Sequence, residues 1–313
     1  MAILDNALLE EKRKTEAALA YIEKHPQLDP LHGFASPRSR RSRVVQKAQL
    51  VWHRGFVRGV SLLNPRNPKT LSDFLRHLSL RFLRDLKVEI ESELDDKTAD
   101  TVDGLLARPP GTLQRLSLEG WGELRSLWMR LPALSHVEVT AHELNLGKVR
   151  APRLERAVFS CYQLTAAACR AIAAAEIPRV RHLSVTLSAP PAFDWLGNCS
   201  VRTVRPLLAR SDLRDLRFLG LKQCDFADDL ARALNQAPIL ASLDHLDLSG
   251  GNLTDDGAEA LVLAVRSLRH LKVLDLSDNF LSRAGVRTVG RICRRVVTRG
   301  QTTENRRYRF TVE

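Results

Sequence analysis

The chain has 313 residues and carries 48 Lys plus Arg against 36 Asp plus Glu, a formal net charge of +12. Its 44% hydrophobic and 27% charged residues are typical of a globular protein and exclude wholesale disorder, and only 5% of the residues are aromatic, which indicates an aliphatic core. No apolar stretch approaches the roughly 20 residues of a membrane helix, and five cysteines without a C-x-x-C pair are poor material for disulfides or structural zinc. We therefore expect a cytoplasmic protein without a signal peptide or membrane span.

The first 50 residues are predicted to form a helix followed by a basic linker. Residues 2–24 place apolar side chains at helical spacing among charged ones, and His25-Pro26 ends the helix. This helix suits a cap on the repeats that follow, with a free partner-binding helix as the alternative. The stretch 36–43 is rich in arginine and serine. We interpret it as a solvated linker, with a nucleic-acid arm or a phosphorylation site as alternatives.

The strongest regularity is a leucine pattern near the C-terminus. Two sets of leucines lie 28 residues apart, namely Leu243, Leu246, Leu248 and Leu253, then Leu271, Leu274, Leu276 and Leu281. With Leu243 as position 1, apolar residues fall at positions 1, 4, 6 and 11, and the alternation at 4 and 6 predicts a short strand with one buried face. Position 9 favours a small polar side chain that hydrogen-bonds to the backbone where the chain turns away from the strand. Asn279 and Cys224 occupy it, and we interpret Cys224 as structural. Thr254 and Ser282 are predicted to cap the helix after the strand.

The same spacing, followed back along the chain, indicates eight repeats. They begin at residues 83, 113, 134, 154, 180, 216, 243 and 271. The two shortest repeats, of 21 and 20 residues, have little room for a helix and are predicted to return through an extended or single-turn segment. The longest, of 36 residues, contains the stretch 188–199, in which paired prolines indicate an insertion loop that carries Trp195.

Residues 213–290 resemble leucine-rich repeats of the ribonuclease-inhibitor type, with the pattern L-x-x-L-x-L…N-x-L…G. The segment 52–62, W-H-R-G-F-V-R-G-V-S-L, resembles the one that leads into repeats in bacterial proteins with a repeat-companion domain. The resemblance implies an α/β fold, a leucine-rich repeat solenoid or horseshoe with a parallel concave β-sheet and convex helices or extended segments. We expect a helical N-terminal cap and basic linker over 1–50, the solenoid over 51–298 and a C-terminal cap strand over 299–313.

The concave strand face is read from positions 2, 3, 5 and 7 of each repeat. Its charged residues comprise eight basic and eight acidic groups, arranged in bands of one sign. Half of the positive surplus lies instead in residues 286–313, which hold eight basic and two acidic groups. A neutral, banded face is typical of protein recognition, whereas a face that follows a phosphate backbone is expected to be strongly basic.

Nothing in the sequence indicates catalysis, a cofactor or a metal site. The motifs H-E-x-x-H, G-x-x-x-x-G-K-[ST], G-x-S-x-G and G-x-G-x-x-G are absent. His136, His182 and His245 share position 3, but an intervening strand places each roughly 10 Å from the next, too far for one zinc ion. Asp244 and Asp247 beside His245 imitate an acid–base set without a nucleophile. We expect no enzyme, no cofactor and no small-molecule substrate, with an unfamiliar active site as the remaining alternative.

The leading hypothesis is a protein–protein interaction scaffold that binds a protein partner through the concave strand face and the 188–199 loop. Its candidate residues are Arg181, Trp195, Arg217, Phe218, Lys222, Asp244, His245, Asp247, Lys272 and Asp275. Phe218 and Trp195 are the expected anchors, unless Phe218 is an isolated exposed ring and Trp195 folds onto the core. The alternative is nucleic-acid binding by the Arg-rich C-terminal segment and residues 38–43. Its candidate residues are Arg38, Arg40, Arg41, Arg43, Arg294, Arg295, Arg306 and Arg307.

Overall fold

The structure is a computed structural model that describes most of the repeat region. The described residues are 47–53, 56–63, 75–90, 109–120, 122–188 and 199–302, together with Arg13, Glu16, Ala17 and Ala20. These four single residues are helical, as the helix predicted over 2–24 requires, and the rest of that helix lies outside the described residues. The basic stretch 36–43, most of the 188–199 loop and the tail after residue 302 also lie outside them.

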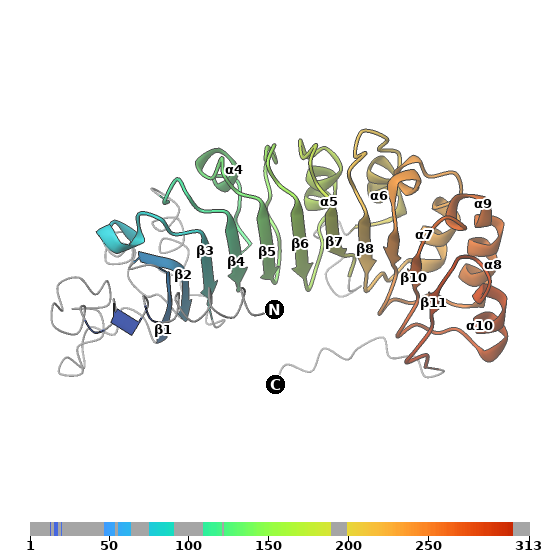
Figure 1. The fold of residues 1–313 in the computed structure, drawn as a ribbon. Coiled ribbons are helices and arrows are strands. Elements are labelled where there is room, and N and C mark those ends of the chain that lie inside the picture. The colour runs from blue at the N-terminus through green and yellow to red at the C-terminus, as the bar shows by residue number, and fades with distance from the viewer. Residues whose placement is uncertain are drawn as a thin grey trace. The chain divides into compact units, whose positions relative to one another are not determined.

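The chain divides into two compact parts, which are described separately. The N-terminal part comprises residues 1–121 and 126–140, and the C-terminal part comprises residues 122–125 and 141–313. In both parts the described strands follow one another in sequence order (Figure 1).

The described strands of the N-terminal part are an antiparallel pair followed by parallel neighbours. They are β1 (Lys47–His53), β2 (Phe56–Leu63), β3 (Asp85–Glu89), β4 (Arg115–Glu119) and β5 (His136–Ala141). A 3-10 turn, η2 (Leu78–Leu80), precedes β3, and a single helical turn, α4 (Leu127–Arg130), precedes β5.

Strand β2 belongs to a further repeat that the sequence pattern missed. Val60 lies opposite Leu86, and Leu62 lies opposite Val88, in the parallel register of β2 and β3. These pairs make Val57, a fully buried residue, position 1 of a repeat upstream of the eight predicted ones. Strand β1 pairs antiparallel with β2 and so covers the edge that this repeat would otherwise leave open.

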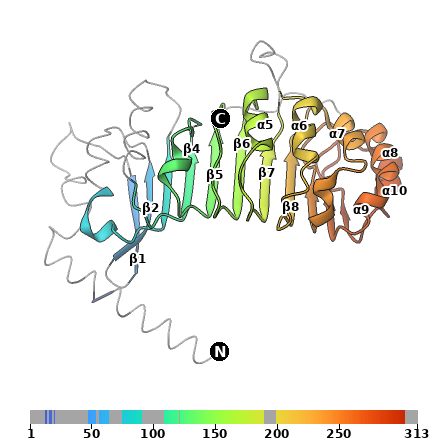
Figure 2. The ribbon, with the colours of Figure 1, turned by 90° about the horizontal axis from the view of Figure 1, so that it is seen from above.

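The described strands of the C-terminal part are all parallel. They are β6 (Arg156–Cys161), β7 (His182–Thr186), β8 (Phe218–Lys222), β9 (His245–Asp247), β10 (Val273–Asp275) and β11 (Val296–Val297). The helical segments are α5 (Ala166–Ala173), α6 (Val201–Leu208), α7 (Ala227–Ala233), η4 (Pro238–Ser242), α8 (Asp255–Leu263), α9 (Val265–Leu268) and α10 (Arg283–Val289). Figure 2 shows α5, α6 and α7 side by side along one face of the strands. Within the described ranges, no helix is both long and apolar enough to cross a membrane.

Aliphatic side chains at positions 1, 4 and 6 form the core. In the repeat that begins at residue 216, Leu216, Leu219 and Leu221 are completely buried. All eight predicted strands are present, so the predicted α/β repeat solenoid with a parallel sheet is confirmed. The two short repeats also match their prediction. One contains only the single turn α4, and the other returns through extended backbone in which Arg150 forms a bridge with Glu176.

Asn279, at position 9, joins two repeats from inside the core. Its Nδ2 donates to the carbonyls of Leu248 and Leu276 at 3.0 and 3.1 Å, and its Oδ1 accepts from the amide of Leu253 at 3.1 Å. This confirms the backbone-bonding role predicted for position 9. Cys224 at the same position is buried, and burial raises the pKa of its thiol, as expected for a structural cysteine.

Gln301 repeats the bonding of Asn279 in the next repeat. Its Nε2 donates to the position 6 carbonyl of the preceding repeat at 2.7 Å, and its Oε1 accepts from the position 11 amide at 3.0 Å. Because Val296 lies opposite Leu274, Gln301 is position 9 of a repeat that begins at Cys293. The sequence pattern missed this repeat because valine and glutamine replace the expected leucine and asparagine.

A second polar ladder links the helices of consecutive repeats. Asp228 accepts from the amide and hydroxyl of Thr254 at 2.8 and 2.7 Å, and Asp255 accepts from the same groups of Ser282 at 2.9 and 2.5 Å. Thr254 and Ser282 also cap α8 and α10, as predicted. The glycine that recurs in these repeats leaves room for the ladder, because a Cβ on Gly257 would overlap Oδ1 of Asp228.

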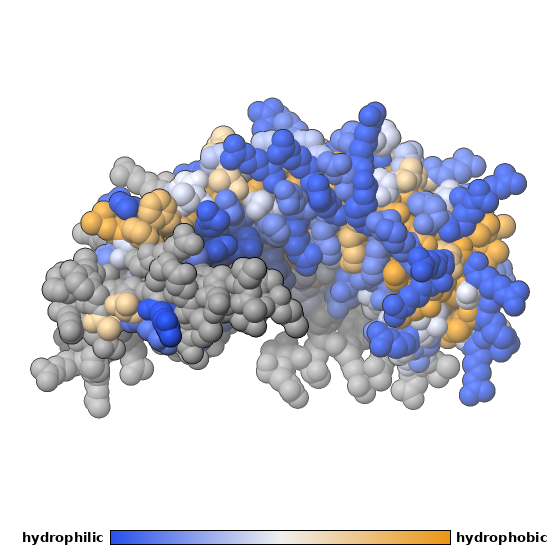
Figure 3. Space-filling view, viewed as in Figure 1, coloured by the Kyte–Doolittle hydropathy of each residue, from blue (hydrophilic) through white to orange (hydrophobic). Residues whose placement is uncertain are grey.

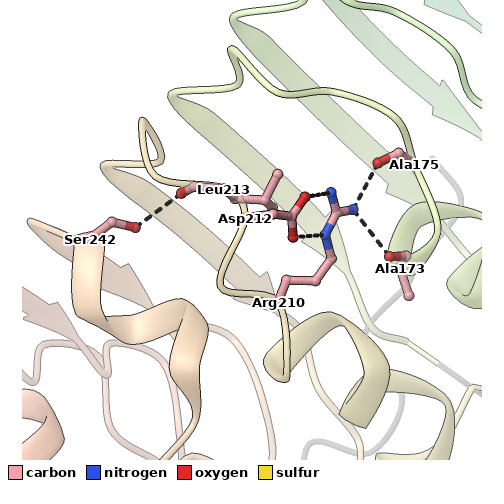
Figure 4. A network of polar contacts seen from close by, with 6 residues as sticks. All are labelled: Ala173, Ala175, Arg210, Asp212, Leu213 and Ser242. Atoms are coloured by element: carbon pink, nitrogen blue, oxygen red, sulfur yellow. Dashed lines mark hydrogen bonds and ion pairs between the residues drawn. The ribbon is translucent and has the colours of Figure 1, made fainter.

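Arg210 ties the end of α5 to the segment between α6 and β8 (Figure 4). Its Nη1 donates to the carbonyls of Ala173 and Ala175 at 3.1 and 2.8 Å, while its Nε and Nη2 donate to Asp212 at 2.8 and 2.5 Å. The last carbonyls of a helix lack partners within the helix, and this guanidinium satisfies them.

Asn279→Ala tests the ladder inside the core. Loss of the amide leaves the Leu253 N–H and the Leu248 carbonyl buried without a partner, so we expect the free energy of unfolding to fall by about 3 kcal/mol. Asn252→Ala is the matched control, because Asn252 is only partly buried, and we expect a change within about 0.5 kcal/mol. Urea denaturation followed by circular dichroism measures both. Equal effects of the two substitutions would contradict the bridging role.

Gly257→Ala tests the ladder between the helices. Alanine favours a helix by about 1 kcal/mol over glycine, but here the added Cβ meets Asp228 and Leu253, so we expect a net loss of about 2 kcal/mol in unfolding free energy. Gly111→Ala is the control, since a Cβ there meets no atom within 4 Å. Thermal denaturation of the two variants distinguishes them, and a Gly257→Ala variant as stable as the control would rule out the close approach.

Candidate functional site

Position 3 of consecutive strands forms a row of large side chains in the C-terminal part. Arg156, His182, Phe218 and His245 lie opposite one another in the register of β6 to β9. The rings of His182 and Phe218 stack with centroids 4.0 Å apart and planes 6° apart, while Phe218 and His245 lie 4.7 Å apart at 52°. We call His182, Phe218 and His245 the ring row. Phe218 is therefore part of a stack and not an isolated exposed ring.

Gly220 leaves the space beside the ring row. A Cβ at this residue would lie 2.7 Å from Oγ of Ser184 and 3.2 Å from Cε1 of Phe218. Ser184, on the neighbouring strand, is buried. A side chain at position 5 of β8 would thus displace either the serine or the phenylalanine ring, so the glycine permits the observed stack.

The two histidines of the ring row differ in their surroundings. Burial, together with the positive charge of Arg156 and the nearby His245, lowers the pKa of His182 to about 4, so His182 is neutral at neutral pH. Nε2 of His245 is buried and has no hydrogen-bond partner among the described residues. The row therefore contains a neutral imidazole at His182 and, at His245, a buried ring nitrogen without a partner in the described part of the chain.

The cations around the ring row fall into two groups. Nη1 of Arg217 donates to the backbone carbonyls of Arg214, Leu216 and Ser242 at 2.9 to 3.1 Å. This nitrogen therefore holds the backbone that leads into β8 and β9. Lys222 lies 4.0 Å from a carboxylate oxygen of Asp247. By contrast, Arg156 and Arg181 form no ion pair within the described ranges. These two arginines are the uncompensated charges beside the rings.

The candidate acidic residues are bonded within their own repeats or to a neighbouring repeat. Oδ2 of Asp244 pairs with Nζ of Lys272 at 3.0 Å. Oδ1 of Asp247 accepts from the amide of Ser249 at 3.0 Å, and Asp275 makes the equivalent bond to the amide two residues later at 2.9 Å. Neither Asp244 nor Asp247 bonds to His245, so the acid–base set that their spacing imitates is not assembled.

The insertion loop leaves from the opposite end of the strands. Its two flanking residues meet at Leu164, whose amide donates to the carbonyl of Ser188 at 3.0 Å and whose carbonyl accepts from the amide of Cys199 at 2.9 Å. Ser188 lies six residues beyond His182, which at about 3.3 Å per residue places the loop base roughly 20 Å from the ring row. Trp195 itself lies outside the described residues.

The other candidates are placed as follows. Arg294 and Arg295 are exposed just before β11, whereas the remaining nucleic-acid candidates lie outside the described residues. His136 belongs to the N-terminal part, where its Nδ1 lies 2.9 Å from the hydroxyl of Ser135. Across the part of the chain that the structure describes, no three His, Cys, Asp or Glu side chains are grouped to hold a metal ion.

Sequence reasoning missed that Arg156, His182 and Gly220 belong to this site. The sequence pattern places His182 in a spaced row of histidines, with Arg156 and Phe218 on the strands between them, but it does not select His182 or Arg156 as candidate residues. A signal is nevertheless present, because residues at equal positions in adjacent repeats stand side by side in a parallel sheet. The repeats, aligned under one another at position 3, place a phenylalanine between two histidines.

Most of the visible surface elsewhere is hydrophilic, with hydrophobic residues over the α8 and α9 end of the C-terminal part and over the η2 end of the N-terminal part (Figure 3). Val262 and Leu263 of α8 are exposed there, Leu263 to 78%. Such scattered exposure is ordinary for a folded protein. The ring row is the group that combines aromatic rings, an unpartnered polar atom and uncompensated charge.

The low pKa of His182 predicts a pH effect on stability. In the unfolded chain this imidazole takes a proton near its ordinary pKa of 6.5, whereas in the folded protein it resists protonation down to about 4. Protonation of the unfolded state alone removes stability as the pH falls from 6.5 to 4. We expect His182→Phe, which keeps a ring in the row, to lose less stability over this interval than the unchanged protein. Urea denaturation at a series of pH values measures this, and identical pH slopes would contradict it.

Comparisons with known proteins agree with this repeat architecture. The sequence profile described as Leucine Rich repeat matches residues 240–262 and 267–289. A search by sequence among curated proteins found no match. A solved structure of a Bacteroides fragilis protein has a TM-score of 0.64 and 18% identity, over 74% of this chain and 70% of that one. An internalin from Listeria monocytogenes has a TM-score of 0.41 and 14% identity, over 77% of this chain and 59% of its own. The repeats and the fold together show a leucine-rich repeat solenoid.

Proposed function

We propose that this protein is a non-catalytic scaffold that binds a protein partner through the strand face of its C-terminal part. The observation that carries the proposal is the ring row with the uncompensated Arg156 and Arg181 beside it. Aromatic side chains and arginines are the residues that most often dominate binding energy at protein interfaces. Repeat proteins characteristically use the extended face of their stacked strands for binding.

The surroundings of the ring row support a preorganised interface. Asn279, Gln301 and the carboxylates of Asp228 and Asp255 fix adjacent repeats to one another through bonds of 2.5 to 3.1 Å. A surface held in this way loses little conformational entropy on binding. The rings are themselves stacked, so ordering them on contact with a partner adds little cost.

The 188–199 loop with Trp195 remains a proposed second contact. Its base is held at both ends by Leu164. Because the ring row and the loop base are roughly 20 Å apart along the strands, one partner that touches both must cover the length of the strand face. From the sequence pattern we also propose that the repeats are of the ribonuclease-inhibitor type and that the protein is bacterial.

Nucleic-acid binding is a second candidate, favoured by the basic C-terminal edge. Arg291, Arg294, Arg295 and Arg299 are exposed, and none of them has an ion-pair partner within the residues that the structure describes. Binding to single- or double-stranded oligonucleotides that weakens steeply with salt would support this candidate. No binding at about 50 mM salt, where phosphate contacts are strongest, would reject it.

Phe218→Ala tests the proposed protein interface. Partners captured from the native host by the full chain are identified, purified and titrated calorimetrically against the unchanged protein and the variant. Removal of an anchor ring at an interface centre is expected to cost about 2 kcal/mol, a roughly 30-fold weaker Kd. The control is Arg202→Ala, on the exposed side of α6, for which we expect an unchanged Kd.

A partner that binds Phe218→Ala as tightly as the unchanged protein would place the interface elsewhere. Thermal denaturation of both variants checks that the fold is intact. If the purified partner is a nucleic acid rather than a protein, the second candidate replaces the first.

A further inference from the structure

The orientation of the ring row decides which part of each ring meets a partner. His182 and Phe218 stack face to face at 4.0 Å, and the ring of His245 lies 4.7 Å from Phe218 at an angle of 52°. Side chains of a strand stand roughly perpendicular to the sheet, so the outward parts of these stacked rings are their edges. The edge of an aromatic ring is electrically positive and its face is negative. The row therefore offers a partner the positive edge of Phe218, flanked by the imidazoles of His182 and His245.

Two arginines lie beside the row. Arg156 stands next to His182 at position 3, and Arg181 precedes His182 on the same strand. Neither arginine has an ion-pair partner in the described ranges. Glu155 stands level with Arg181 in the register and precedes Arg156, but it forms no ion pair with either arginine within the described ranges. Asp244 pairs with Lys272, and Asp247 faces Lys222.

We propose that the ring row, with Arg156 and Arg181, recognises an acidic segment of a partner protein, with an Asp or Glu carboxylate set between the two guanidiniums and the ring edges. This inference rests on the proposed protein-binding function and specifies the chemistry of the partner. A carboxylate accepts charge-assisted hydrogen bonds from arginine, often two from one guanidinium.

The geometry favours a peptide over a nucleic acid at this place. Binding of single-stranded nucleic acid depends on free aromatic faces, on which bases stack. Here His182 stacks on one face of Phe218, and the tilted ring of His245 lies 4.7 Å from it, which leaves little room for a base. Neutral His182 also separates Arg156 from Phe218, so the cations are gathered at one end of the row and do not follow a line. A short cluster of positive charge fits one or two carboxylates better than an extended phosphate backbone.

A peptide selection tests the inference while the natural partner is still unidentified. A random peptide library displayed on phage is selected on the full chain, and peptides that also bind the Phe218→Ala variant are removed. The remaining peptides require the ring row. We expect them to be enriched in Asp and Glu relative to the starting library.

One enriched peptide is then titrated by fluorescence anisotropy with each acidic residue unchanged or replaced by its amide. We expect the amide peptide to bind the unchanged protein about tenfold more weakly. With Arg156→Ala and Arg181→Ala combined, the two peptides should bind equally, because the groups that distinguish them are gone. The Arg202→Ala control should retain the tenfold difference. Circular dichroism and the denaturation midpoint show whether the double variant is folded.

Three outcomes overturn the inference in distinguishable ways. Peptides that require Phe218 but show no acidic enrichment, or bind equally well as amides, overturn acidic recognition and leave the proposed protein interface standing. A selection in which no peptide distinguishes the unchanged protein from Phe218→Ala overturns the interface itself. A single-stranded RNA probe is titrated in parallel, and its binding with loss in Phe218→Ala would assign the row to nucleic acid instead.

Discussion

Burial of aliphatic side chains at positions 1, 4 and 6 holds neighbouring strands in parallel, equal register, and the rest of the structure depends on this register. Leu216, Leu219 and Leu221 are completely buried. A shift of one strand against its neighbours would expose such side chains to water, so their burial holds the register. Equal register also aligns the solvent-facing positions. Rows of side chains at one position are therefore a consequence of how the core packs.

The same register accounts for both polar ladders. Asn279 and Gln301 reach the carbonyl of position 6 and the amide of position 11 in the preceding repeat, and each side chain satisfies backbone groups that the turning chain leaves unpaired. On the helical side, Asp228 and Asp255 bond to the cap residue of the following helix. These bonds fix the spacing of the repeats from residue 216 onward, and the bonds of Asp228 to Thr254 join the repeats that carry Phe218 and His245.

The stacking of the rings restricts which ligands can bind to this surface, because it determines which parts of the rings a ligand can contact. Phe218 lies between two histidines and packs against their rings, so its edge is the part left for a partner. The positive edge of Phe218 and the two arginines without ion pairs both favour a negatively charged group of the partner. The neutral sum of charges over the whole strand face conceals this local excess, since most acidic side chains near it already have partners.

Leucine spacing by itself determined the repeat architecture, the eight predicted strands, the missing helix of the short repeats and the capping roles of Thr254 and Ser282. Such features depend on burial periodicity and local backbone bonds, which a single chain segment carries. The repeats that begin at Val57 and Cys293, the hairpin of β1 and β2, and the bond pattern of Gln301 emerged only from the tertiary structure. The tertiary structure also revealed the ring row, the lack of ion pairs at Arg156 and Arg181 among the described residues, and the bonds from Arg217 to backbone carbonyls. Stacking, ion pairing and carbonyl bracing join residues from different repeats, so they are decided by strand register in three dimensions and not by local sequence.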